Sequence, residues 1–258
     1  MGISSVPMSV FLVMLAFSAA IIGLGIFVAV RTRRQLQALL TAERIYPADA
    51  RQGYFRVEGK AVVAGKKQVL APLTRSPCLW YRIKVEKYER RPGTSDNRNH
   101  SDWHTIRSDE SEANFLVEWD GKSIRVDPHG AEITPTDKSQ WKGATEDPED
   151  RNPPRFLPTE HALGDGVRID ISGLSDSKYR YSEERIYEGD PMFIVGEIAE
   201  TGKGRFTLRK PSDRRPFLIG TTEPGKHAEL QRMGIVGAMF IAGIGAAIML
   251  WLLWTRWG

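Results

Sequence analysis

Two long apolar runs, one near each end of the chain, constrain its fold more than any other feature. The first covers residues 10–30 and the second covers residues 233–254, and neither contains an ionisable side chain. An α-helix needs about 20 predominantly apolar residues to cross the ~30 Å hydrocarbon core of a bilayer. We therefore predict two transmembrane helices, and we expect the function to lie in the polar residues between them.

Charge is nearly balanced in this polar part. All 32 acidic residues and all but two of the 36 Lys and Arg residues lie between positions 31 and 231. Basic residues form only short clusters, such as those at 31–34 and 90–91. Short clusters are typical of solvated or membrane-flanking surfaces, whereas a nucleic-acid site usually needs a longer basic stripe. We predict no nucleic-acid partner.

The basic residues beside the apolar runs predict an orientation in the membrane. No Lys or Arg precedes the first run, but Arg31, Arg33 and Arg34 follow it, as is typical of a retained anchor rather than a cleaved signal peptide. Lys226 and Arg232 precede the second run. Because cytoplasmic flanks carry the excess of Lys and Arg, we predict that the central domain lies on the cytoplasmic side.

Small residues follow one face of the second predicted helix. Gly234, Ala238, Ala242 and Ala246 are spaced four apart, and small faces let helix backbones approach closely in lipid. This spacing predicts packing against the first helix or against another copy of the chain, so a homo-oligomer formed through the transmembrane helices is one expectation.

Short strands separated by turns are predicted between residues 53 and 222. Apolar and polar residues alternate over 79–88, and apolar runs recur at 115–119, 123–126 and 192–198. Asp120-Gly121, between two such runs, is a strong hairpin signal. The pattern predicts a mainly β domain, barrel-like or sandwich-like, with few short helices, between the two transmembrane helices.

The remaining segments complete the predicted organisation. Residues 31–52 are predicted to form a juxtamembrane helix and linker, and residues 223–232 a second juxtamembrane helix. Polar loops are predicted near 90–113, with a short strand at 103–106 within it, and near 136–161, which has few apolar residues. Residues 167–171 are predicted as an edge strand, and residues 183–188 as a short helix or turn.

Several motifs, taken in their order along the chain, resemble the GIDE domain, also called BAM for "beside a membrane". The best match is Tyr-Ser-Glu-Glu-Arg-Ile-Tyr-Glu-Gly-Asp at 181–190, followed by Val-Gly-Glu at 195–197. Others lie at 57–61, 78–82, 103–106 and 126–128. The resemblance covers about residues 55–220, and the two-helix layout matches too. It implies a relative of membrane-bound E3 ubiquitin ligases and of their prokaryotic homologues. We expect the protein to lie in a prokaryotic cell membrane.

The chain departs from the ligases of this family in its zinc ligands. A RING domain holds two Zn²⁺ with about eight Cys and His ligands. This chain has one Cys and five His, and only two residues follow Arg256. No nucleophile-elbow or Walker-type pattern occurs either. We predict no RING, no metal, no cofactor and no catalytic residue, and we favour a protein that is not itself an enzyme.

The function predicted from these observations is binding. We expect a membrane-anchored binding or scaffolding module that recognises a protein, a peptide or a lipid at the membrane surface. The alternative is a component of a ligase-like or hydrolytic enzyme system, in which Asp102 and His104 would act as the hydrolase acids. The residues predicted to contact a ligand are Trp103, His104, Glu183, Glu184, Asp190 and Glu197. The acids among them could instead cap turns and pair with neighbouring Arg residues.

Overall fold

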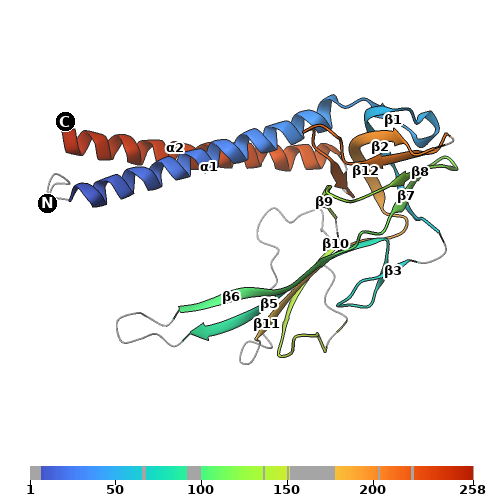
Figure 1. Cartoon of the computed structure of the whole chain (residues 1–258), viewed down its shortest axis with the longest axis horizontal. Coiled ribbons are helices and arrows are strands. Elements are labelled where there is room, and N and C mark those ends of the chain that lie inside the picture. Colours follow the sequence, from blue (N-terminus) through green and yellow to red (C-terminus); the bar gives the residue numbers. More distant parts are fainter. Residues whose placement is uncertain are drawn as a thin grey trace. The chain divides into compact units, whose positions relative to one another are not determined.

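The computed structural model describes residues 7–65, 68–91, 100–135, 137–149, 151, 178–202, 204–221 and 224–257. These residues form two compact units, a helical unit (1–42 and 224–258) and a β unit (43–223) (Figure 1). The elements are α1 (Met8–Thr41), β1 (Arg44–Ile45), the 3₁₀ helix η2 (Pro47–Asp49), β2 (Gly53–Val63), β3 (Val69–Leu70), β4 (Pro77–Cys78), β5 (Trp80–Arg91), β6 (His100–Glu110), β7 (Phe115–Trp119), β8 (Lys122–Val126), β9 (Glu132–Thr134), β10 (Asp137–Gly143), β11 (Tyr179–Ile186), β12 (Pro191–Glu200), β13 (Phe206–Arg209), β14 (Leu218–Gly220) and α2 (Pro224–Trp257).

Helices α1 and α2 pack against each other as an antiparallel pair, as Figure 1 shows. A Cβ atom built on Gly25 would lie 2.8 Å from the carbonyl oxygen of Ala238 and 2.9 Å from the Cβ of Ala242. At the other end of the pair, the guanidinium carbon of Arg256 lies 4.9 Å from the centre of the Phe11 ring. The small residues of the second helix therefore do pack closely against the first helix of the same chain.

Both helices are long and apolar enough to cross a membrane. Only 17% of the most apolar stretch of each helix is buried within the structure, so most of the apolar side chains are uncovered. Each helix is also continuous over 34 residues. The predicted juxtamembrane helical segments continue the membrane helices: α1 extends to Thr41, and α2 begins at Pro224.

Five strands of the β unit close into a barrel. Around it, β2 pairs with β7, β7 with β8, β8 with β13, β13 with β12, and β12 with β2 again. Only the β8–β13 contact is parallel. This order, with one parallel contact, is that of the five-stranded Greek-key barrel of the OB type. Strands β1, β14 and β9 extend the barrel sheet. The β-rich, barrel-like fold predicted from the sequence is confirmed.

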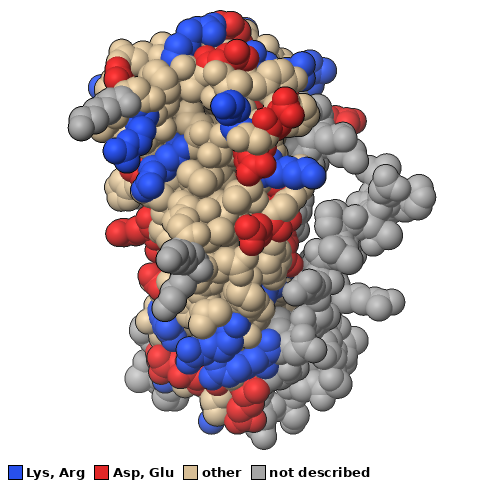
Figure 2. Space-filling model, turned by 90° about the vertical axis from the view of Figure 1, so that its right-hand side faces the viewer, with Lys and Arg blue, Asp and Glu red and all other residues tan. Residues whose placement is uncertain are grey.

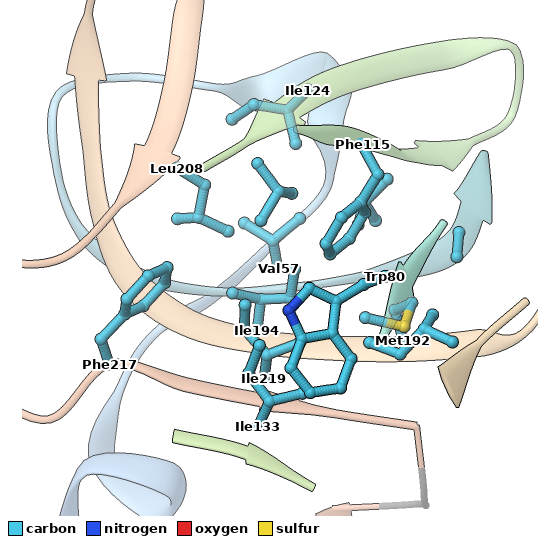
Figure 3. Close-up of a cluster of buried hydrophobic side chains, with 14 of the residues drawn as sticks. Val57, Trp80, Phe115, Ile124, Ile133, Met192, Ile194, Leu208, Phe217 and Ile219 are labelled. Atoms are coloured by element: carbon cyan, nitrogen blue, oxygen red, sulfur yellow. The ribbon is translucent and has the colours of Figure 1, made fainter. Parts of the chain in front are cut away.

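The interior of the barrel is a single apolar cluster. Val57, Ile194 and Leu208 are fully buried there, each from a different barrel strand. Trp80, the first residue of β5, is also fully buried and lies among them, as Figure 3 shows. A buried indole and branched side chains fill a small barrel without a pore. Trp80 thereby joins the second sheet to the core of the barrel.

The second sheet has the strand order β10-β11-β5-β6 and is antiparallel throughout. Two insertions between barrel strands form this sheet. In sequence, β5 and β6 come between β2 and β7, and β10 and β11 come between β8 and β12. On its inner face, Leu73, Ile83, Val85 and Tyr181 form a separate fully buried cluster.

Three sequence predictions for this sheet were wrong. The loop predicted near 90–113 contains the end of β5 and all of β6, and the loop predicted at 136–161 contains β10. The helix or turn predicted at 183–188 belongs largely to β11. Strands β6 and β10 are polar because one of their faces is solvated, whereas β11 also carries the buried charged residues Glu183 and Arg185. The predicted strand at 167–171 lies outside the described residues.

A buried ion-pair network fixes the residues before β4 to this sheet. Arg185 is 2% exposed and donates to Glu183 at 3.1 Å and to Asp137 at 2.7 Å. The fully buried Glu183 carboxylate also accepts the backbone N–H of Leu73 at 2.8 Å and the hydroxyl of Thr74. Because each charge is met by partners inside the protein, the cost of removing them from water is offset.

The first prediction concerns the helix pair. Gly25→Ala should lower the thermal unfolding midpoint of the protein in detergent, because the new methyl group must push α1 and α2 apart at a cost of about 1–3 kcal/mol. Gly23→Ala is the matched control, since nothing lies within 4 Å of a Cβ at that position. Equal midpoints for the two variants would contradict close packing at Gly25.

The second prediction compares two adjacent glutamates. Glu183→Ala should destabilise the protein by about 3–5 kcal/mol, because it leaves a buried Arg185 short of a partner. Glu184→Ala should cost less than about 1 kcal/mol, since Glu184 pairs with the more exposed Arg82 and Lys138. Urea unfolding followed by tryptophan fluorescence measures both. Similar losses for the two variants would show that the buried network does not stabilise the fold.

Candidate functional site

A groove of about 1020 Å³ lies on the outer face of the barrel, over β7, β8 and the turn between β12 and β13. One wall is the 3₁₀ segment around Pro47 and Ala50, and the other is the turn at 201–205. Leu116 and Ser123 lie between these walls. OB-type barrels use this strand pair and this turn to hold ligands, so the groove is the candidate site by geometry, with the fold as an analogy.

Three cationic residues line the groove. Lys122 and Arg125 come from β8, and Arg205 comes from the turn before β13; all three are exposed. None of them forms an ion pair with another residue in the described part of the chain. The lining includes one acid, Asp127, whose carboxylate accepts the backbone N–H of His129 at 3.1 Å. The groove is therefore suited to an anionic ligand.

The turn that forms one wall is held in place by its own hydrogen bonds. The backbone N–H of Thr201 donates to the carbonyl of Arg205 at 2.8 Å, and the N–H of Arg205 donates to the carbonyl of Gly202 at 3.1 Å. The Glu200 carboxylate accepts the N–H of Gly204 at 3.0 Å. The hydroxyls of Thr201 and Thr207 lie 3.1 Å apart. Such a preorganised wall lowers the entropy lost when a ligand binds.

The groove does not have the lining that single-stranded nucleic acids need. Its aromatic lining residue is Phe206, which is half-buried and belongs to the barrel interior. Bases are normally held by stacking on exposed aromatic rings. On the face drawn in Figure 2, basic side chains gather in one patch near the lower end, flanked by acidic ones, while elsewhere the two signs are interspersed. The groove can therefore bind negative charge but has no platform for bases.

Trp103 and His104, two of the predicted ligand residues, lie on the edge strand β6 of the second sheet. The Trp103 ring centre is 5.3 Å from that of Tyr88 and 4.8 Å from the guanidinium carbon of Arg180. Arg180 also donates to Glu86 at 2.7 Å, and this hydrogen bond lowers the pKa of the Glu86 carboxyl group. His104 is partly exposed opposite Lys87. A half-buried aromatic between cations is common on solvated sheets.

The predicted acids are each held by neighbouring protein groups. Glu183 is in the buried network, and Glu184 bridges Arg82 and Lys138 on the outer face of the second sheet. Asp190 accepts the N–H of Tyr187 at 2.8 Å in a tight turn, and burial raises the pKa of its carboxyl group. Glu197 accepts the N–H of Ser212 at 2.9 Å. Ligand binding by the six predicted residues stays a prediction.

None of the cations of the groove was predicted from the sequence. The strand predicted at 123–126 contains Arg125, and the alternation of a strand puts Arg125 on the same face as Ser123. Arg205, 80 positions further on, lines the same groove. That proximity follows from the parallel β8–β13 contact, which no local sequence pattern reports.

Metal and thiol chemistry find no support in this part of the molecule. Within the described residues, no group of three His, Cys, Asp or Glu side chains is arranged to hold a metal ion. Cys78 is fully buried, and burial together with the nearby Glu183 carboxylate raises the pKa of its thiol to about 12. A thiol of this kind is a poor nucleophile and a poor metal ligand near neutral pH.

Comparison with known proteins gives one match. The family model for GIDE, described as "E3 Ubiquitin ligase", matches residues 85–246, from strand β5 into helix α2. Neither the search of curated proteins nor that of solved structures gives a match. Because the matched segment covers more than half of the sequence, and agrees with the resemblance seen at residues 55–220, the chain belongs to the GIDE family.

Proposed function

We propose that this protein is a membrane-anchored binding module whose barrel groove holds an anionic ligand at the membrane surface. The observation that carries this proposal is that one preorganised groove is lined by three cationic residues, none of them ion-paired within the described residues: Lys122, Arg125 and Arg205. Surface cations are usually balanced by nearby acids, as Arg82 is by Glu110 and Glu184 in the second sheet. Unbalanced cations in a concave site point to a ligand that supplies the negative charge.

The anchoring part of the proposal rests on the helical unit. Apolar side chains such as Phe17, Phe27 and Phe240 are 62–70% exposed on α1 and α2. Exposing this much apolar surface to water is unfavourable, whereas lipid tails can surround it without that cost. The polar ends of both helices, with Arg31, Arg33 and Arg34 on α1, then extend to the bilayer surface. We place the protein in a prokaryotic cell membrane; self-association through the helices stays a prediction.

The ligand we favour is an acidic segment of a partner protein. An open groove with apolar as well as cationic lining, such as Pro47, Ala50 and Leu116, fits a chain of side chains better than a compact headgroup. A lipid headgroup supplies the same negative charge, and the test below distinguishes the two. Scaffolding follows if the bound partner is held at the membrane by α1 and α2.

A second candidate function comes from the description of the family as an E3 ubiquitin ligase. A RING needs about eight Cys and His ligands, and this chain has one Cys and five His. The chain would therefore take part in transfer chemistry only with a separate zinc-bearing partner, for which the groove would be a docking site. Binding is the step that both functions share.

The third prediction tests the groove. Full-length protein in lipid nanodiscs should bind a fluorescein-labelled hexapeptide of alternating glutamate and valine, and the affinity should fall as salt is raised. Combined reversal of Lys122, Arg125 and Arg205 to Glu should weaken binding by about tenfold or more, because three pairs of roughly 0.5–1 kcal/mol each are lost. Fluorescence anisotropy measures the affinity, and inositol bisphosphate replaces the peptide in the lipid arm.

The matched control reverses three exposed lysines outside the groove. Lys60→Glu, Lys138→Glu and Lys142→Glu together change the net charge by the same amount, and Lys142 lies 6.0 Å from the Trp103 ring centre. Peptide binding should survive this change. Loss of binding in the control alone would move the site to the second sheet and contradict the groove. Binding of inositol bisphosphate but not of peptide would make the ligand a headgroup.

The fourth prediction concerns the side of the membrane. Gln140→Cys places a thiol on an exposed position of β10. A membrane-impermeant maleimide should leave this variant unlabelled in intact bacterial cells and should label it after lysis, because the β unit faces the cytoplasm. Labelling of intact cells would place the β unit outside.

A further inference from the structure

The groove contains a strand edge that is only partly paired. All five residues of β8 pair with β7, from Lys122 with Trp119 to Val126 with Phe115. On its other side, β8 pairs with β13 only through Arg125 and Val126. The first three residues of β8 therefore have no strand partner on the groove side among the described residues. An unpaired edge is a template for another extended chain.

The hairpin geometry shows which peptide groups face the groove. The turn residues Asp120 and Gly121 have φ angles of 51° and 71°, which are those of a two-residue type I′ hairpin. In such a hairpin Trp119 and Lys122 exchange hydrogen bonds, and the pattern then alternates along the strand. The N–H and C=O of Ser123 consequently point away from β7.

A neighbouring hydrogen bond supports this alternation. Peptide groups two residues apart on a strand point the same way, so those of Ser123, Arg125 and Asp127 share one edge. The N–H of Asp127 donates to the carbonyl of Leu208 in β13 at 3.0 Å, and Arg125 is paired with Thr207. Two of the three positions on this edge are thus used by β13, and Ser123 is the one that opens into the groove.

The opposite wall leaves room beside this edge. The backbone groups of Thr201 and Arg205 are bonded within the turn, so they are not directed to Ser123. Nothing lies within 4 Å of a Cβ built on Gly202 or Gly204. The turn therefore does not pair with Ser123, and the groove of about 1020 Å³ beside this edge is open to a ligand.

We infer that an acidic polypeptide segment binds by adding a short strand to β8 at Ser123. The backbone of the ligand would exchange hydrogen bonds with the Ser123 peptide groups. Its alternate acidic side chains would lie on the face of Ser123 and Arg125, toward Arg125 and Arg205. This inference rests on the proposed function, and it adds the mode of recognition. Main-chain bonds supply register, and the three cations supply selectivity for acids.

The longer free edge, on β6, is a weaker candidate for strand addition. Its exposed side chains are of both signs, with Asp102 and Asp109 beside Arg107, and Arg107 already pairs with Asp147. Charged side chains along an edge strand commonly prevent it from pairing with another chain. The β6 edge therefore offers no charge that selects a partner, whereas the β8 edge does.

The test uses the full-length protein in nanodiscs and the glutamate–valine hexapeptide. A set of peptides, each N-methylated at one backbone position, removes one donor at a time without changing charge. Strand addition at Ser123 predicts that methylation at one backbone position, the one whose N–H donates to the Ser123 carbonyl, weakens binding by about tenfold or more. Methylation at the other positions should change binding by no more than about twofold. One sensitive position among insensitive ones is the signature of a main-chain bond to Ser123.

Protein variants test the other side of the same bond. Ser123→Pro removes the N–H that faces the groove and leaves the β7 side paired, so it should weaken peptide binding about tenfold. Ser123→Ala keeps the N–H and should bind as the wild type does. If Ser123→Pro fails to fold, the N-methylated series on the wild type decides.

Two outcomes distinguish a failure of strand addition from a failure of the proposed function. Equal binding of all the N-methylated peptides would overturn strand addition, while the charge dependence of binding would leave the proposed function intact. If the unmodified hexapeptide binds the wild type no better than it binds the triple charge-reversed variant, the proposed function itself fails, and strand addition fails with it.

Discussion

The pairing of β2 with β12 is the contact on which the rest of the β unit depends. It joins Gly53–Lys60 to Pro191–Ile198 over eight register positions, and it turns an open five-stranded sheet into a closed barrel. Closure also brings together the chain segments that lead from the barrel into the second sheet. The backbone N–H of Leu79 donates to the carbonyl of Ile186 there. Strands β5 and β11 can then pair, although about 90 residues separate them in sequence.

One of the five contacts that close the barrel, between β8 and β13, is much shorter than the others. Around the barrel, the antiparallel contacts hold four to eight register pairs each, whereas the parallel β8–β13 contact holds two. Parallel pairing is slightly less favourable per residue, and here it stops at Arg125. Residues of β8 and of the turn before β13 line the groove where this pairing ends. The candidate site is thus a consequence of topology, and the cations on its two sides determine which ligands it suits.

Local patterns predicted the elements whose signals are local. The Asp120-Gly121 hairpin, the alternating strand β5 and both apolar helices are where the sequence placed them. Strand β11 was missed because Glu183 and Arg185 point inward as a buried pair, which disrupts the apolar alternation of a half-buried strand. Strand β10 has Trp141 as its single large apolar residue. The groove joins residues 80 positions apart, so no window of sequence contains it.

The burial of Cys78 has a practical consequence for spectroscopy. It is the single cysteine of the chain, it has no exposed surface, and the pKa of its thiol is raised to about 12. Almost none of this thiol is ionised at neutral pH, so alkylating reagents react with it slowly in the folded protein. The native protein is therefore already a clean background for fluorophores, spin labels or cross-linkers attached at one chosen surface position.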